Sequence, residues 1–207
     1  MYVSAELRWF WQSPPIDLYT WFCDPSIHTC AVGGGTTRDD AYILDALAEI
    51  GIKRRGEEGV EVKGLVDVLK EEPIAPFSGG PIEIWSKWSV ASLTLVDPLI
   101  VVTKQRWVRQ FATPDQPMRE IALDADEHPI DGLPHAEGCN VEYAEVSIFG
   151  HRPWFSFGFE AFGSLATVAS SLRLTMARLA ELQPPPFTDS LCLSYPAWIA
   201  RLTQRRP

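Results

Sequence analysis

The sequence predicts a mainly β (α+β) fold, built either as a closed antiparallel barrel or as a sandwich. Ten stretches rich in Val, Ile, Trp, Phe and Tyr are separated by turn-forming residues, whereas one segment alone has clear helical periodicity. Within several of these stretches charged residues alternate with apolar ones, as they do in a strand with two different faces. No repeat or linker divides the chain, so residues 1–207 are expected to form one domain.

The elements follow in chain order. Turn-forming residues separate most of the candidate strands. The segment RGEEG at 55–59 has the length of a hairpin connection. The glycine-rich segment GGGTTRDD at 33–40 lacks the lysine of a phosphate-binding P-loop and is interpreted as a flexible loop. The acidic segment 124–138 is interpreted as a second loop. The candidate strands are 4–11, 20–24, 41–45, 50–56, 59–68, 81–90, 99–111, 119–124, 139–150 and 152–162.

A C-terminal helix is predicted near residues 164–182. Apolar residues recur there every three to four positions, and three consecutive prolines at 184–186 end the pattern. The segment after the prolines is apolar enough to pack back onto the domain. The recurring residues are Leu165, Val168, Leu172, Met176, Leu179 and Leu182.

The composition of the chain argues against some classes of binding partner. The net charge of −9 argues against a broad surface for nucleic acid or for an anionic membrane, although it leaves room for a local basic pocket. The sequence contains no run of about 18 apolar residues, so no membrane span is expected. No secretory signal is evident. The four cysteines form no CxxC pair, so reduced thiols and a cytoplasmic location are expected.

Charge alternates on one face of at least five candidate strands. Because side chains alternate across a strand, residues two apart share a face, and the opposite face of each of these strands is apolar. The charged sets are Glu6 with Arg8 and Phe10, Lys53 with Arg55, Glu61 with Lys63, Glu83 with Trp85 and Lys87, and Lys104 with Arg106.

Two arrangements explain this pattern. In the first, the charged faces form the wet outside of a sandwich. In the second, they point into the lumen of a barrel, and helices cover the apolar faces. Large aromatic side chains on the apolar faces favour the barrel, because surrounding helices would cover them. The mixture of glutamates with a larger number of lysines and arginines on the charged faces also favours the barrel. Such a mixture suits a polyanion bridged by a divalent metal, since carboxylates bind Mg²⁺ or Mn²⁺ and cations bind phosphate oxygens.

The order of these motifs resembles the CYTH superfamily, the triphosphate tunnel metalloenzymes. The resemblance covers residues 4–182 and rests on the segments ELRWF, IKRRG, EVKG, IWSKW, VTKQRWVRQF, REIALD, CNVEYAEV and GFEAFG. It implies an eight-stranded antiparallel tunnel, a triphosphate substrate and a requirement for Mg²⁺ or Mn²⁺. The family's first strand carries Glu-x-Glu-x-Lys, whereas this chain has Arg8 in place of the second glutamate and Phe10 in place of the lysine.

Carried over by position, the resemblance assigns roles to ten side chains. Glu6 and Glu160 are the expected catalytic carboxylates, and Glu6, Glu142 and Glu160 are the expected metal ligands. Water oriented by a carboxylate would attack the phosphoryl group in line. The expected substrate-binding residues are Arg8, Lys53, Arg55, Lys63, Lys87, Lys104 and Arg106.

The sequence leaves three functions open. The first is a metal-dependent triphosphatase, a hydrolase acting on acid anhydrides. The second is a non-catalytic protein of the same fold that binds a phosphorylated small molecule or polyphosphate, which the changes at Arg8 and Phe10 favour. The third is a β-rich interaction module with a wet charged face. The sequence does not determine the substrate or the oligomeric state.

Overall fold

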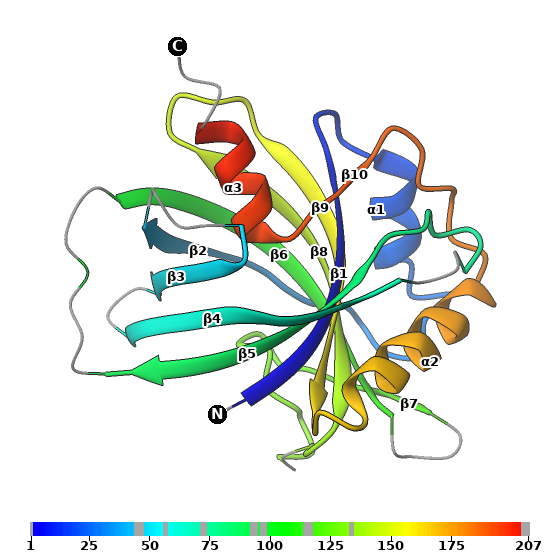
Figure 1. Cartoon of the computed structure of the whole chain (residues 1–207). Coiled ribbons are helices and arrows are strands. Elements are labelled where there is room, and N and C mark those ends of the chain that lie inside the picture. Colours follow the sequence, from blue (N-terminus) through cyan, green and yellow to red (C-terminus); the bar gives the residue numbers. More distant parts are fainter. Residues whose placement is uncertain are drawn as a thin grey trace.

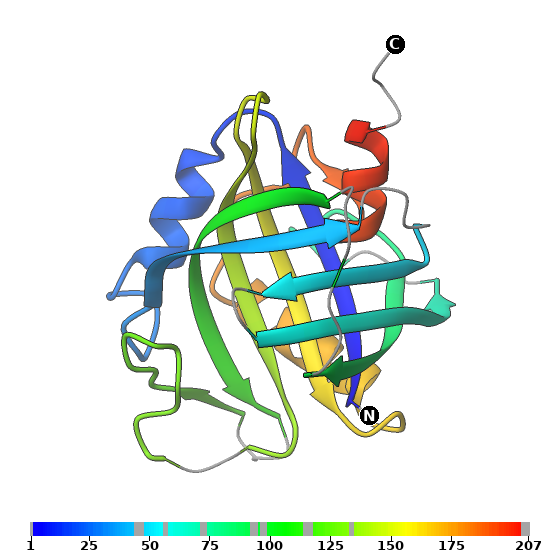
Figure 2. The same ribbon diagram turned by 90° about the vertical axis from the view of Figure 1, so that its left-hand side faces the viewer.

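A computed structural model describes residues 2–43, 48–55, 58–70, 74–91, 95, 99–113, 118–132 and 135–203. Eight strands form a closed antiparallel barrel in the order β1-β5-β4-β3-β2-β6-β8-β9, and β9 pairs back onto β1 (Figures 1 and 2). The predicted mainly β, eight-stranded barrel is therefore confirmed. The strands are β1 (Tyr2–Trp11), β2 (Gly33–Ile43), β3 (Ile50–Arg55), β4 (Glu58–Leu69), β5 (Ile82–Val90), β6 (Leu99–Ala112), β8 (Gly138–Ile148) and β9 (Trp154–Gly163).

Two short strands extend the barrel wall. β7 (Arg119–Ile121) pairs with the end of β6, and β10 (Leu191–Cys192) pairs with Trp9 and Phe10 of β1. The predicted strand at 119–124 is thus three residues long. No helix among the described residues is long and apolar enough to cross a membrane.

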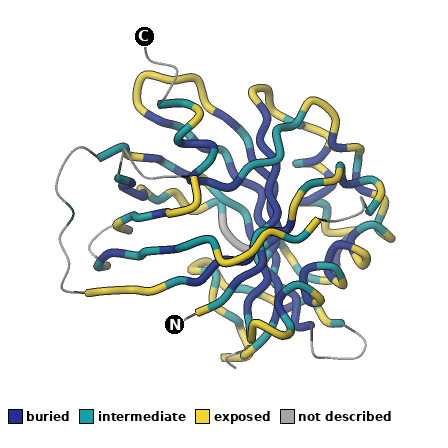
Figure 3. Tube along the Cα trace, in the orientation of Figure 1, coloured by how far each residue is buried: buried dark blue, intermediate teal, exposed yellow. Residues whose placement is uncertain are grey.

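The outer face of one half of the barrel packs under two helices. α1 (Ile16–Cys23) and α2 (Val168–Ala180) lie against β1, β8 and β9, and Figure 3 shows these central strands largely buried. The core between helices and wall includes Trp9, Phe77, Phe157 and Phe159, none of which is more than 2% exposed. The outer face of β5 differs, since Trp88 there is 44% exposed.

The predicted strand at 20–24 is wrong, because residues 16–23 form α1. Pro15 precedes its first residue, and Leu18, Trp21 and Phe22 fall three and four positions apart, so they share the helix face that is buried on the barrel. The aromatic content of this segment indicates burial rather than extension.

The predicted loop at 33–40 is also wrong, because this segment is most of β2. It pairs with β6 along its whole length, with an irregularity between Gly34 and Thr36. Gly35 has φ +77° there, a backbone conformation that glycine adopts without strain. The strand therefore forms through its partner β6, despite its low local strand propensity.

The C-terminal part of the chain confirms the helix and adds another. The predicted helix at 164–182 is observed as α2. The tail packs back as expected and forms α3 (Tyr195–Thr203), which closes one end of the barrel. Trp198 of α3 stacks on Phe10 of β1 at 5.0 Å between ring centroids, and both side chains are fully buried.

Candidate functional site

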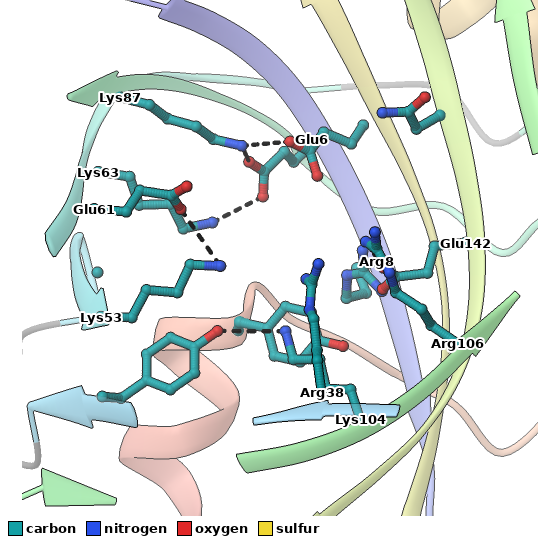
Figure 4. A pocket seen from close by; sticks show the side chains of 15 residues that line it. Glu6, Arg8, Arg38, Lys53, Glu61, Lys63, Lys87, Lys104, Arg106 and Glu142 are labelled. Atoms are coloured by element: carbon teal, nitrogen blue, oxygen red, sulfur yellow. Dashed lines mark hydrogen bonds and ion pairs between the residues drawn. The ribbon is translucent and has the colours of Figure 1, made fainter. Parts of the chain in front are cut away.

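The barrel lumen holds a cavity of about 230 Å³ that is lined mainly by charged side chains. The labelled side chains in Figure 4 extend from opposite walls of the barrel toward one shared space. The residues on the cavity surface are seven cations (Arg8, Arg38, Lys53, Lys63, Lys87, Lys104 and Arg106), four carboxylates (Glu6, Glu61, Glu142 and Glu160), and Tyr42, Gly51, Asn140 and Tyr195.

The structure brings nine of the ten sequence-predicted site residues to this cavity. The tenth, Arg55, ends β3, and its side chain lies outside the described residues. These charges therefore line the lumen, and their assignment to the wet outside of a sandwich is wrong. Phe10 also faces inward, as its alternation with Glu6 and Arg8 predicts, but it lies beyond the cavity under α3.

A first ionic cluster joins β1, β4, β5 and β9. Glu6 accepts from Lys63 at 2.8 Å and from Lys87 at 2.9 Å, and Lys87 also contacts Glu160. Burial disfavours the charged form of Glu6, but the two lysines outweigh burial and hold its pKa well below its ordinary value. The pKa of Glu160 is likewise lowered, because Lys87 outweighs burial and the repulsion from Glu6. Both carboxylates are therefore ionised at neutral pH.

A second cluster is centred on Glu142 of β8. Its two carboxylate oxygens contact Arg8 at 2.7 Å and Arg106 at 3.2 Å. Despite burial, these two cations hold the pKa of Glu142 far below its ordinary value. Arg8 also donates to the hydroxyl of Ser156 at 3.2 Å.

Gly158 of β9 makes room for Arg8. A Cβ atom at this position would lie 2.7 Å from the Cζ atom of Arg8, closer than side-chain contacts allow. The sequence suggests that the small residues beside Glu160 leave space for a ligand, but the guanidinium of Arg8 fills the space at Gly158.

A third cluster lies at the base of the cavity, near α3. The fully buried carboxylate of Asp40 contacts Lys104 at 3.1 Å, Lys53 at 3.3 Å and Arg38 at 3.7 Å. The Nζ atom of Lys104 also lies 3.6 Å from the ring centroid of Tyr195. Burial lowers the pKa of Lys104 well below its ordinary value, although Asp40 favours the charged form.

Sequence reasoning missed Arg38, Asp40, Tyr42 and Tyr195. The first three alternate along β2, and their spacing would have placed them on one face had the segment been recognised as a strand. Tyr195 carries no such signal, because it enters the lumen from a helix.

The expected metal ligands do not fit a divalent cation as they are arranged. The described residues contain no group of three or more His, Cys, Asp or Glu side chains that could hold a metal ion. Lys87 bridges Glu6 and Glu160, and two arginines hold Glu142, so cations already neutralise the oxygens that Mg²⁺ or Mn²⁺ requires.

The lumen is rich in basic side chains within an acidic chain. Seven lysine and arginine side chains face four carboxylates on the cavity surface. Three further carboxylates lie close to these groups: Asp40 below the surface, Glu83 on the inward face of β5, and Glu127, which contacts Arg106 from the segment between β7 and β8. The chain as a whole carries −9. The lumen therefore gathers basic side chains in a chain that is acidic overall.

A scan of the sequence against known family models finds no match, and a search of curated proteins finds no relative. The CYTH resemblance thus stays a prediction, and the function has to be argued from the geometry of the lumen.

Proposed function

We propose that the protein binds a phosphorylated small molecule or a short polyphosphate in the lumen of its barrel, without metal-dependent hydrolysis. The observation that carries this proposal is the convergence of seven lysine and arginine side chains on one cavity. Ammonium and guanidinium groups donate to phosphate oxygens through short, charge-assisted hydrogen bonds. An ordinary protein interior contains few such groups, because a buried charge is costly unless it is paired.

Arg38 provides a second support. Its Nε atom is buried and has no hydrogen-bond partner among the described residues, whereas its Nη2 atom lies 3.7 Å from a carboxylate oxygen of Asp40. A buried donor that lacks an acceptor costs free energy, typically about 1–3 kcal/mol. A phosphate oxygen in the cavity would supply the missing acceptor, so Arg38 is assigned to ligand binding together with Lys53 and Lys104.

The arrangement of the carboxylates favours binding over turnover. Metal-assisted attack on a phosphoryl group needs carboxylates that hold the metal and orient water. Glu6, Glu142 and Glu160 instead neutralise neighbouring lysines and arginines. Arg8, at the position of the family's second glutamate, donates to Glu142. In this proposal Glu6 and Glu160 hold the basic side chains in place instead of acting in catalysis.

The test is the response of the purified protein to tripolyphosphate in EDTA and in Mg²⁺ or Mn²⁺. We expect tripolyphosphate in EDTA to raise the melting temperature, and ligand at about 100 times its Kd stabilises by about 2.7 kcal/mol. We expect no release of inorganic phosphate in either buffer. The absence of a thermal shift in both buffers would contradict the proposal, and metal-dependent phosphate release would establish the triphosphatase instead.

A further inference from the structure

A second cavity lies outside the barrel wall, on the side that α1 and α2 cover (Figure 1). It measures about 440 Å³, and pockets for drug-sized ligands measure about 300–1,000 Å³. Residues 27–30 between α1 and β2, residues 118–120 at β7 and the C-terminal end of α2 surround it. Phe111 of β6, which belongs to the core on the outer face of the wall, also lines it. The cavity is therefore separate from the lumen.

The lining of this cavity is largely apolar, and His28 is a buried polar group within it. Ile27, Phe111, Met118 and Leu182 provide apolar surface. His28 is only 7% exposed, and its ring packs edge-on against that of Trp21 at 5.1 Å between centroids. Neither nitrogen of the imidazole has a hydrogen-bond partner among the described residues.

An unpartnered buried histidine needs an explanation, because a buried donor or acceptor without a partner costs free energy. A phenylalanine would pack against Trp21 equally well and would carry no unpaired nitrogen. A ligand that forms a hydrogen bond with the ring would remove this cost. The histidine is therefore a mark of a binding site rather than of simple packing.

The charge state of His28 determines which ligand group it can bind. Burial and the neighbouring Arg109 lower the pKa of His28 to about 4, although Glu120 favours the charged form. The imidazole is thus neutral at pH 7, with one N–H donor and one acceptor nitrogen. The backbone carbonyl of Trp21 is placed to attract the N–H group, although it makes no regular hydrogen bond with it. The acceptor nitrogen has no donor among the described residues, so the ligand has to provide one.

The charged side chains of the lining favour an uncharged ligand, because each already has an ion-pair partner. Those of Arg178 and Arg119 are also 44% and 53% exposed, so they lie at the solvent edge of the cavity. The three pairs are Glu120 with Arg109 at 2.6 Å, Arg178 with Glu181 at 2.8 Å, and Arg119 with Asp131 at 3.8 Å.

The segment that carries His28 is anchored on both sides. The backbone N–H groups of Thr29 and Cys30 donate to the carboxylate of Glu120 at 3.0 Å and 3.2 Å. Arg109 donates to the carbonyl of Phe22 at 2.9 Å and to that of Cys30 at 2.7 Å. The site is therefore preformed, and a ligand that enters it has little of the protein to order.

From this cavity and its unpartnered imidazole, we infer a second ligand site, which takes an uncharged molecule of one or two rings that carries a hydroxyl group, as phenols do. The apolar side chains cover the rings, and the hydroxyl group donates to His28. The site lies outside the lumen, so this inference is independent of the proposed function.

Three compounds with the same ring and different polar groups test the inference. Para-cresol has a hydroxyl donor, para-methylanisole has an ether in its place, and para-toluate has a carboxylate. In titrations of the unmodified protein monitored by NMR, para-cresol should bind at least about tenfold more tightly than para-methylanisole, a difference of about 1.4 kcal/mol. Para-toluate should bind no more tightly than the ether. Equal binding of para-cresol and para-methylanisole, or tightest binding of para-toluate, would overturn the inference.

A variant locates the site. His28→Phe keeps a ring of similar size and removes both nitrogens, so it should bind para-cresol at least about tenfold more weakly and no longer prefer it to para-methylanisole. The control is His151→Phe on the exposed turn between β8 and β9, which should keep the preference. A folded His28→Phe protein that still prefers para-cresol would overturn the inference. The comparison of the three compounds on the unmodified protein holds whether or not this variant folds.

Discussion

The same strands form both faces of the barrel wall, but their outward and inward side chains have different roles. On β1, Leu7 and Trp9 point outward into the core beneath the helices, where Trp9 packs against Phe77 and Phe187. On the same strand, Glu6 and Arg8 point inward and are held by ion pairs. Burial of the outer residues contributes about 25 cal/mol per Å² of apolar surface. Buried ion pairs like the inner ones give little net stability, because desolvation offsets their attraction.

The difference teaches that the stability of the barrel comes from its outer face, so the charges of the inner face need another explanation. An apolar lumen of similar volume would fold at least as well by this reasoning. Seven lysine and arginine side chains on one cavity are what the proposed ligand site requires.

The largest effect is expected from a methyl group added on the inner face. Gly158→Ala places a Cβ atom 2.7 Å from the Arg8 guanidinium. Such overpacking should displace Arg8 from Glu142 and cost up to about 3 kcal/mol of unfolding free energy. Urea denaturation monitored by tryptophan fluorescence measures this loss.

The matched control is Gly64→Ala on the outer face of β4. Its Cβ atom would make an ordinary contact of 3.8 Å with the half-exposed ring of Trp88. We expect a change within about 0.5 kcal/mol. If the two variants unfold at the same urea concentration, the tight packing of Arg8 over Gly158 is not a feature of the folded protein.

A smaller effect is expected in the acid dependence of stability. The pKa of Glu142 lies far below its ordinary value of 4.5 in the folded chain, because Arg8 and Arg106 outweigh its burial. The unfolded chain therefore binds more protons between these two pKa values. The stabilisation is complete above the unfolded pKa and is lost as pH falls toward the folded one.

Glu142→Gln should remove this contribution. At pH 7 the variant should be about 1.5–3 kcal/mol less stable, since a charged hydrogen-bond partner is lost. Between pH 6 and pH 3 it should lose less stability than the unmodified protein, while Glu6 and Glu160 maintain the remaining acid dependence. If the variant and the unmodified protein lose the same amount of stability over this range in urea titrations, then Arg8 and Arg106 do not lower the pKa of Glu142.

Much of the wall could be predicted from local patterns. The spacing of Glu6 and Arg8 and that of Lys104 and Arg106 placed each pair correctly on one face, because alternation is a property of any strand. α2 also followed from periodicity, although the helix is shorter at both ends than the predicted range 164–182.

The remaining features depend on long-range contacts. β2 contains three consecutive glycines and is held by pairing with β6, more than 60 residues later in the chain, so Arg38 and Asp40 could not be placed by local propensity. Tyr195 reaches the lumen only because α3 docks across the barrel end. The partners of each carboxylate likewise depend on which strands become neighbours, and this decides whether Glu6, Glu142 and Glu160 bind metal or lysine and arginine.

The most direct test of an anion site in the lumen uses two adjacent residues on opposite faces of β3. Lys53 faces the cavity, whereas its neighbour Arg54 is exposed on the outer face. Calorimetric titration with tripolyphosphate should show about tenfold weaker binding for Lys53→Gln, or about 1.4 kcal/mol, and unchanged binding for Arg54→Gln. Equal affinities in the two variants, with both chains folded, would contradict the account.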